Sequence, residues 1–235
     1  MNAKSILLSI IIPVYNEETH IEEVLRRIKA AKLPENVDRE IIVIDDGSND
    51  RTPQILKKFK EDKLVTVHSS PTNFGKGTAI RIGLQIAKGD IILIQDADLE
   101  YNPDEYSKLL EPILSGRAKV VYGSRFKGQI IGMLPIYRLA NMILTFLTNL
   151  LFSAGITDEA TCYKVFSREV FDQIRLTSKR FEFCPEVTAK LLKSGYKIYE
   201  VPISYRSRSV QEGKKISLKD AFFAIWTLIK YRFVS

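Results

Sequence analysis

The first hundred residues alternate between short runs of β-branched apolar residues and longer segments whose apolar residues recur at helical spacing. The short runs predict strands at residues 9–12, 40–44, 65–67 and 91–94. The segments between them predict helices at residues 17–31, 52–59 and 77–87. Because parallel strands need crossovers of this length, the alternation predicts an α/β fold with a mostly parallel central sheet flanked by helices.

Polar clusters follow the predicted strands of this first half. They are residues 15–17, 45–46, 73–77 and 96–98. In open parallel sheets, ligands bind beyond the carboxyl ends of the strands. We therefore expect all four clusters, although distant in sequence, to face one common ligand site.

The most unusual cluster is Asp96-Ala97-Asp98, which is followed by Leu99 and Glu100. Three acids within five residues repel one another unless a cation or hydrogen-bond donors lie among them. Oxygen ligands suit Mg²⁺ or Mn²⁺, which usually bind substrate phosphates as well. An acidic turn that caps a helix starting at residues 102–105 is the alternative. The local sequence leaves both interpretations open.

The other clusters offer groups that suit a nucleotide. Tyr15 can stack on a base, and Asp46 can accept a hydrogen bond from a base N–H group. Gly75-Lys76-Gly77 allows the backbone to approach a ligand closely and supplies a cation, although it is not a Walker-type P-loop. Each cluster alone is a weak indication, because such residues are also common in ordinary loops.

The second half is less regular. It predicts strands at residues 119–122, 163–166 and 197–205, and helices that end near 114, span 185–194 and span 217–233. The first of these strands runs into Gly123-Ser124-Arg125. Residues 133–152 are strongly apolar, but polar residues such as Arg138 interrupt them, so we expect no simple membrane-spanning helix there. An interfacial helix and a core helix are both compatible with that segment.

Charge and cysteine content restrict the partners and the compartment. The net charge is +7 and the pI is about 9.3, which indicates anionic partners such as phosphates, nucleic acid or an anionic membrane surface. Two cysteines and the lack of a secretion signal fit a reducing compartment. Cys162 could be a nucleophile, but the chain has only two histidines, so a structural thiol fits better.

Four motifs in the first half occur in a distinctive order: PVYNE, DDGSNDRT, NFGKGTA and DADLE. Together with TDEATCYKVF, FEFCPE, EVPISY and RSVQEGKKIS in the second half, they make the chain resemble the inverting GT-A-fold glycosyltransferases of the dolichyl-phosphate mannose synthase type. The resemblance implies one GT-A catalytic domain over residues 1–235. Within it, 1–100 would bind the nucleotide-sugar, 101–216 the acceptor, and 217–235 would form an amphipathic helix.

The resemblance also implies roles for individual residues on the donor side. The positions that contact the base and ribose are Pro13, Tyr15, Glu17 and Asp46. Lys76, Asp96, Ala97 and Asp98 would also bind the nucleotide-sugar. Asp96 and Asp98 would bind a Mg²⁺ or Mn²⁺ ion, with Glu100 as a further ligand. A basic loop would close over the site through Arg208, Lys214 and Lys215, although Arg206 competes with Arg208 for the matching position.

On the acceptor side, the resemblance assigns Arg125 and Arg138 to the phosphate of a polyprenyl or dolichyl phosphate. A phosphate monoester is already ionised, so it needs arginines to position it but no general base. A hydroxyl acceptor would need a carboxylate base, for which Asp158 and Glu186 are the candidates. Both are also ordinary turn or helix-start residues. The phosphate acceptor is therefore favoured, and a hydroxyl of a glycan or lipid-linked saccharide is the alternative.

These implications lead to an expected function and location. We expect metal-dependent transfer of a hexose, with inversion, from GDP-mannose or UDP-glucose, while a UDP-linked N-acetylhexosamine remains possible. The enzyme would lie peripherally on the cytoplasmic face of a membrane, held by residues 133–152, the last helix or a separate membrane partner. A non-catalytic module that binds anionic surfaces is a remote alternative. No nucleic-acid partner is expected, because the carboxylate cluster would repel nucleic-acid phosphates.

Overall fold

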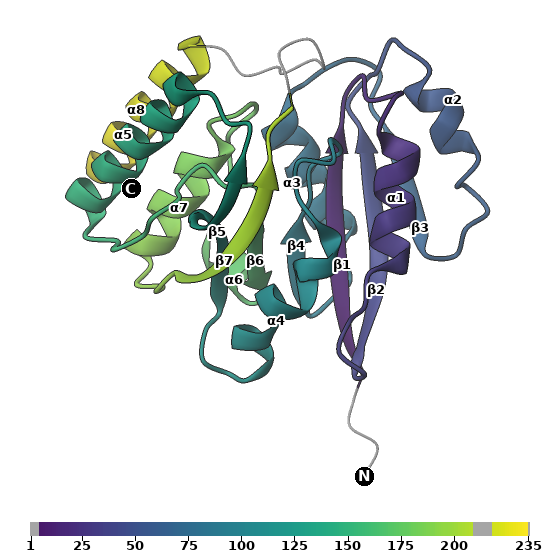
Figure 1. Ribbon diagram of the computed structural model, residues 1–235, viewed down its shortest axis with the longest axis horizontal. Coiled ribbons are helices and arrows are strands. Elements are labelled where there is room, and N and C mark those ends of the chain that lie inside the picture. Colours follow the sequence, from purple (N-terminus) through teal and green to yellow (C-terminus); the bar gives the residue numbers. More distant parts are fainter. Residues whose placement is uncertain (1–4, 209–217, 235) are drawn as a thin grey trace.

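A computed structural model describes residues 5–208 and 218–234 of the chain (Figure 1). A single seven-stranded sheet runs through the molecule in the order β3-β2-β1-β4-β6-β5-β7. The pairs β1–β2, β1–β4, β2–β3 and β5–β7 are parallel, and β6 is antiparallel to both of its neighbours. The prediction of a mostly parallel sheet in an α/β fold is therefore confirmed.

The elements alternate along the first half as the hydrophobic pattern predicts. The strands are β1 (Ile6–Val14), β2 (Val37–Asp45), β3 (Val65–Ser69), β4 (Ile91–Ile94), β5 (Val120–Ile131), β6 (Lys164–Ser167) and β7 (Tyr199–Arg206). The helices are α1 (Ile21–Ala30), α2 (Thr52–Lys57), α3 (Lys76–Ile86), α4 (Tyr106–Leu114), α5 (Pro135–Phe152), α6 (Val170–Gln173), α7 (Phe183–Lys193) and α8 (Leu218–Phe233), with a 3₁₀ turn at Pro103–Glu105.

Strand β5 differs most from its prediction, because it continues far beyond residue 122 through the Gly123-Ser124-Arg125 segment. Two glycines of β5, Gly123 and Gly128, are needed for its close pairing with β7. A Cβ atom at Gly128 would lie 2.0 Å from the backbone oxygen of Ile203 in β7, and one at Gly123 would lie 2.9 Å from the Ile203 side chain. Arg125 therefore lies within β5, at the irregularity of the β5–β7 pairing between Ser124 and Gln129.

Helices α5, α7 and α8 pack together beside the β5–β7 end of the sheet (Figure 1). A small apolar cluster joins them, with Leu144 of α5, Ala189 of α7, and Ala224 and Leu228 of α8 at its centre. The interior of this group is thin, so much of the apolar surface of α5 and α8 stays outside it.

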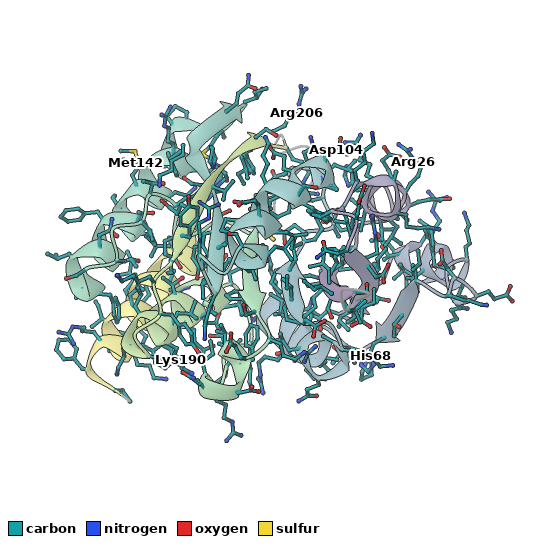
Figure 2. All side chains as sticks on the ribbon, turned by 90° about the horizontal axis from the view of Figure 1, so that it is seen from below. Arg26, His68, Asp104, Met142, Lys190 and Arg206 are labelled. Atoms are coloured by element: carbon teal, nitrogen blue, oxygen red, sulfur yellow. The ribbon has the colours of Figure 1, made fainter. Side chains whose placement is uncertain are left out.

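The outer sides of α5 and α8 expose large apolar residues, which we call the α5–α8 apolar face. On α5 they are Ile136, Leu139, Met142, Ile143, Phe146 and Leu150, and on α8 they are Phe222, Phe223, Trp226 and Phe233. Figure 2 shows Met142 on the outer side of the molecule. Neither the interfacial nor the core interpretation of residues 133–152 is complete, since one side of α5 packs inward and the other is exposed. Among the described helices, none is long and apolar enough to cross a membrane.

Candidate functional site

A pocket of about 560 Å³ opens beyond the carboxyl ends of the strands and extends to the groove between α5 and α8. The four polar clusters of the first half meet at its wall. The predicted site residues that line it are Pro13, Tyr15, Glu17, Asp46, Lys76, Asp96, Ala97, Asp98, Glu100, Arg125 and Arg208. Residues from both halves of the chain therefore enclose one cavity.

The acidic segment leaves β4 in a turn that separates its three carboxylates. Lys76 Nζ lies 2.5 Å from Asp96 Oδ1. Leu99 has φ +60°, a strained value for a residue with a side chain. This turn directs the Glu100 carboxylate toward β7, where it accepts hydrogen bonds from the Tyr205 hydroxyl and the backbone N–H of Arg208. The structure therefore does not gather Asp96, Asp98 and Glu100 as one ligand set.

The acids are not the cap of the following helix either. The Asn102 side chain accepts a hydrogen bond from the backbone N–H of Asp104 and so caps the 3₁₀ turn that precedes α4. Asp96 and Asp98 lie upstream of this cap and face the pocket. The alternative of a purely capping acidic turn therefore leaves both carboxylates unexplained.

The donor set of Asp96 and Asp98 fits a divalent ion that takes its remaining ligands from a bound diphosphate. Among the described residues, no three His, Cys, Asp or Glu side chains are placed to hold a metal by themselves. Mg²⁺ commonly uses one or two protein carboxylates and substrate phosphates. Burial, with repulsion from Asp96 and Glu100, raises the pKa of Asp98 to about 7. A cation at this position would relieve that repulsion.

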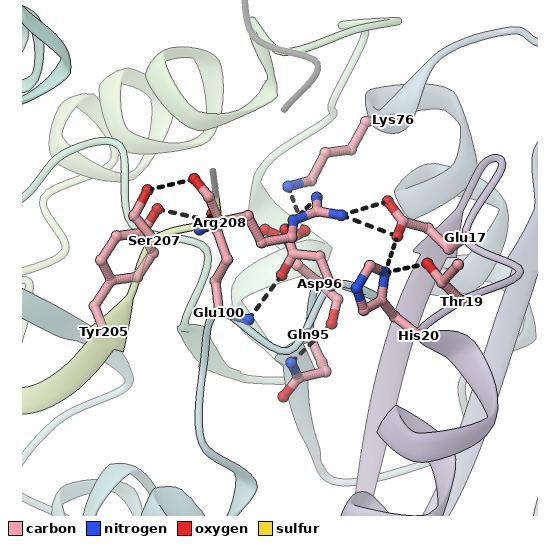
Figure 3. A network of polar contacts seen from close by, with 11 residues as sticks. Glu17, Thr19, His20, Lys76, Gln95, Asp96, Glu100, Tyr205, Ser207 and Arg208 are labelled. Atoms are coloured by element: carbon pink, nitrogen blue, oxygen red, sulfur yellow. Dashed lines mark hydrogen bonds and ion pairs between the residues drawn. The ribbon is translucent and has the colours of Figure 1, made fainter. Parts of the chain in front are cut away.

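Arg208 occupies the centre of the site in this structure (Figure 3). Its guanidinium donates to Glu17 at 3.0 Å and to Asp98 at 2.9 Å, so it joins the β1 loop to the acidic segment. Arg206 is exposed at the end of β7. The sequence does not decide whether Arg206 or Arg208 reaches the site, and in the structure it is Arg208. Lys214 and Lys215 lie outside the described residues.

Asp46 and the glycine loop line the pocket and are also held by contacts with the protein. Both oxygens of the Asp46 carboxylate accept backbone N–H groups, from Phe74 at 3.0 Å and Gly75 at 2.7 Å. A Cβ atom at Gly75 would lie 2.4 Å from the backbone oxygen of Lys179. At Gly75 the missing side chain admits the loop that precedes α7. Close approach of the glycine loop to a ligand stays a prediction, and Gly75 and Lys76 line the pocket.

Arg125 lines the pocket as a buried cation with a buried partner. Its Nε and Nη2 atoms each donate to Asp158 at 2.7 Å. Burial alone would lower the pKa of Arg125, but the Asp158 carboxylate raises it well above its usual value. Both Asp158 oxygens are engaged, and Asp158 is outside the pocket lining. It is therefore placed to hold Arg125 and not to act as a base.

Two other acceptor-side candidates lie away from the cavity. Glu186 is fully buried and accepts hydrogen bonds from Thr177, Ser178 and Lys190. Burial alone would raise the pKa of Glu186, but these hydrogen bonds outweigh it and lower the pKa to about 2. Glu186 is thus unsuited to the role of base. Arg138 is exposed on α5 and is not among the residues that line the pocket.

Sequence reasoning missed three side chains that line the pocket: Glu159, Arg180 and Tyr205. Glu159 is fully buried, and its Oε2 atom has no hydrogen-bond partner among the described residues. The Arg125 guanidinium lies over the Tyr205 ring, 5.0 Å from its centroid. Glu159 and Tyr205 lie in the TDEATCYKVF and EVPISY motifs, which do not single them out, and Arg180 lies outside the quoted motifs. Long-range packing brings all three to the pocket. Burial raises the pKa of the Cys162 thiol, which argues against a nucleophilic role.

Several curated proteins are similar in sequence to this chain. The sequence of this chain is 32% identical over 204 residues to the low-salt glycan biosynthesis hexosyltransferase Agl6 of Haloferax volcanii, covering 86% of this chain and 48% of that protein. It is 30% identical to a UDP-N-acetylglucosamine–dolichyl-phosphate N-acetylglucosaminyltransferase of Methanococcus voltae, covering 95% and 96%. It is 28% identical to the dolichyl-phosphate beta-glucosyltransferase ALG5A of Trichomonas vaginalis, covering 96% and 73%.

Solved structures support the fold. Glucosyl-3-phosphoglycerate synthase of Mycobacterium tuberculosis superposes with a TM-score of 0.76 at 22% identity, covering 98% of this chain and 82% of that one. A second structure of that enzyme, with a TM-score of 0.73, contains Mn²⁺ and uridine diphosphate. At this identity the likeness establishes the GT-A fold alone. The family described as Glycosyl transferase family 2 matches residues 9–175. The chain therefore belongs to glycosyl transferase family 2.

Proposed function

We propose that this glycosyltransferase moves a hexose or N-acetylhexosamine from a nucleotide-sugar to a polyprenyl phosphate, with inversion and with a divalent ion. One observation carries the proposal. The pocket that begins at Asp96 and Asp98 continues without interruption to the groove between α5 and α8, beside the α5–α8 apolar face. A charged donor and an apolar acceptor tail therefore have separate ends of one cavity.

On the donor side, Tyr15, Glu17 and Asp46 line the end of the pocket where a base and ribose would lie. Lys76 and the Asp96–Asp98 segment lie next to it, at the position of the diphosphate. A bound Mg²⁺ or Mn²⁺ would stabilise the charge that develops on the leaving diphosphate. Asp96 and Asp98 would hold that ion, and the buried setting strengthens their electrostatic effect because water is largely excluded.

On the acceptor side, Arg125 of β5 lines the same pocket as the apolar residues of α5 and α8. Asp158 and the Tyr205 ring hold its guanidinium, so little side-chain entropy is lost when it binds an anion. An ionised phosphate positioned by Arg125 attacks the anomeric carbon from the side opposite the leaving diphosphate, which inverts the configuration. No protein base is needed, because that nucleophile carries no proton to remove.

The α5–α8 apolar face supports a peripheral contact with the membrane that holds such an acceptor. Aromatic and long aliphatic side chains cover it, and the last turn of α8 adds Lys230 and Arg232. Apolar side chains with nearby cations are typical of helices that lie in the headgroup region of anionic bilayers. The contact would place the mouth of the groove at the lipid surface.

The experiment that tests the proposal supplies radiolabelled UDP-glucose, UDP-N-acetylglucosamine and GDP-mannose separately, with Mn²⁺ and a polyprenyl phosphate. We expect one donor to yield a product that partitions into organic solvent and releases the sugar in mild acid. Two curated relatives carry glucosyl and N-acetylglucosaminyl transfer to dolichyl phosphate in their names, so the two UDP-sugars are the first donors to try. Failure of every donor to label a lipid would refute the proposal.

A second candidate is transfer to a hydroxyl, and Glu159 is the observation that favours it. This carboxylate lines the pocket with one unpartnered oxygen. Burial has the largest effect on the pKa of Glu159 and raises it. A raised pKa brings the carboxylate closer to the range of a general base. Loss of more than about a hundredfold in kcat for Glu159→Gln, with unchanged acceptor affinity, would favour this candidate. Retained turnover would leave the phosphate acceptor as the only proposal.

A further inference from the structure

The pocket is rich in acids, and nearly all of its cations are already paired. Seven carboxylates line it: Glu17, Asp46, Asp96, Asp98, Glu100, Glu159 and Asp220. Lys76, Arg125 and Arg208 line it too, and each makes an ion pair with a carboxylate of the chain. A nucleoside diphosphate that enters this pocket therefore meets a surplus of negative charge.

Arg180 is the remaining described cation on the pocket wall. Its side chain is exposed, and within residues 5–208 and 218–234 it makes no hydrogen bond or ion pair. Although acids line the pocket, none of the described ones forms an ion pair with Arg180. Its guanidinium is therefore available to an incoming anion.

The backbone around Arg180 is held in place by contacts from two helices. The backbone oxygen of Lys179 accepts a hydrogen bond from the N–H of Thr78 in α3, at 3.0 Å. On the other side, Glu186 of α7 accepts the N–H of Ser178 at 2.7 Å. The Glu182 side chain accepts the N–H of Arg180 itself at 3.2 Å. The segment is thus a fixed support.

The close packing of this support against the glycine loop determines where Arg180 lies. A Cβ atom at Gly75 would lie 2.7 Å from Arg180 Cγ, so the arginine stem runs directly over Gly75. Gly75 is adjacent to Lys76, whose amine pairs with Asp96. Arg180 therefore stands beside the donor end of the pocket, next to the position proposed for the diphosphate.

We propose that Arg180 is a phosphate-binding residue that contacts the diphosphate of the nucleotide-sugar. The assignment rests on the proposed function and deepens it. Arginine suits this task because its planar fork binds two phosphate oxygens at once. In this arrangement the metal site approaches the diphosphate from the end of β4, and Arg180 approaches it from the loop that precedes α7. Together they offset the surplus of acid in the cavity.

The test measures binding by calorimetry with Mn²⁺, using UDP, GDP, uridine and guanosine as probes. Arg180→Ala should weaken the affinity for the diphosphate that binds by about tenfold or more, because a charged hydrogen bond is lost. Affinity for the matching nucleoside, which has no phosphate, should not change. Arg180→Lys should fall between the two, since it keeps the charge but not the fork. Lys179→Ala is the matched control, an exposed neighbour outside the pocket lining, and should bind as wild type.

Other outcomes overturn the assignment in distinguishable ways. Unchanged diphosphate affinity in Arg180→Ala overturns it while leaving the proposed function intact. Farnesyl phosphate serves as a soluble probe for the acceptor phosphate; if Arg180→Ala weakens its binding and not that of the diphosphate, the residue belongs to the acceptor site. Wild-type protein that binds neither diphosphate overturns the proposed function and this assignment together.

Discussion

At the scale of single residues, the site depends on how buried charges are partnered. Arg208 bridges Glu17 and Asp98 where a metal-bound diphosphate would lie, so donor binding must displace or rearrange that bridge. Arg125 and Asp158 form a bidentate pair that is fixed before any substrate arrives. The two arginines thus differ in their partners: Arg208 pairs with two acids from different segments, while Arg125, among the described residues, pairs with Asp158 alone.

Asp98→Asn should lose metal-dependent donor binding without losing the fold. Asp98 carries a pKa of about 7, above its value in the unfolded chain, so the folded state holds the proton more tightly. The free energy of unfolding of the wild type should therefore fall as pH rises from about 4 to 7. The variant should lack that slope and lose about a hundredfold in turnover. Urea unfolding across this pH range and calorimetry of UDP with and without Mn²⁺ check both parts, and unchanged turnover would contradict the assignment.

Glu186→Gln should lower stability in a different pH window. The pKa of Glu186 is held at about 2 in the folded chain, against 4.5 as its ordinary value. The carboxylate therefore stabilises the fold above pH 4.5, and this contribution is lost as pH falls from 4.5 toward 2. Urea unfolding at several pH values should show a stability difference from wild type that shrinks on acidification. A difference that grows at low pH would contradict the role given to Glu186.

At the scale of elements, glycines in β5 and at the start of α3 allow segments from distant parts of the chain to meet. Gly128 admits the β7 backbone, while Gly75 and Gly77 admit the loop that carries Arg180. At each of these glycines, a Cβ atom would clash with the segment that packs there. The two halves of the site are joined at these close approaches.

Gly77→Ala should be destabilising, contrary to the usual effect in a helix. Alanine normally improves a helix by about 1 kcal/mol relative to glycine. Here its Cβ atom would lie 2.7 Å from the backbone oxygen of Ser178, and such overpacking costs about 1–3 kcal/mol. Chemical denaturation measures the sign. Gln85→Ala, an exposed substitution in the same helix, is the control and should change stability by less than about 0.5 kcal/mol; a Gly77→Ala variant more stable than wild type would contradict the contact.

At the scale of the whole molecule, polar and apolar surfaces are segregated. The donor clusters gather at one edge of the sheet, and the α5–α8 apolar face lies beside the β5–β7 end (Figure 1). The pocket connects the two. This segregation would allow the proposed soluble donor and membrane-embedded acceptor to approach from different sides.

Replacing Phe146 and Phe222 together with serine should weaken binding to vesicles of phosphatidylcholine and phosphatidylglycerol by at least about tenfold. Each ring is more than half exposed, at 64% and 67%, and burying a phenylalanine side chain contributes about 1.5–3 kcal/mol. The fold should be unaffected, because neither ring is in the core. Leu64→Ser is the control: it is also an exposed apolar residue, at 42%, but lies before β3. Cosedimentation measures binding, and equal loss in both proteins would contradict a role of the face.

The sequence alone determines the strand–helix alternation, the parallel first half of the sheet and the position of the polar clusters at one edge. These features follow from local hydrophobic periodicity and from the rule that parallel strands end on the same side. Family membership also follows from ordered motifs, as the match over residues 9–175 confirms. The roles of individual site residues stay predictions, since nothing but experiments on variants can measure them.

Only the tertiary structure decides which charged side chains line the pocket and which are paired with other residues of the chain. Asp158 and Glu186 are candidate bases in the sequence. In the structure Asp158 pairs with Arg125, and Glu186 accepts hydrogen bonds from Thr177 and Lys190. Arg180 has no local signal, yet packing against Gly75 brings it to the cavity wall. The sequence allows Asp96 and Asp98 to be either a metal site or a helix cap. In the structure Asn102 is the cap, so the capping role does not belong to the two acids. Such outcomes depend on contacts between residues far apart in the chain, which periodicity and spacing do not encode.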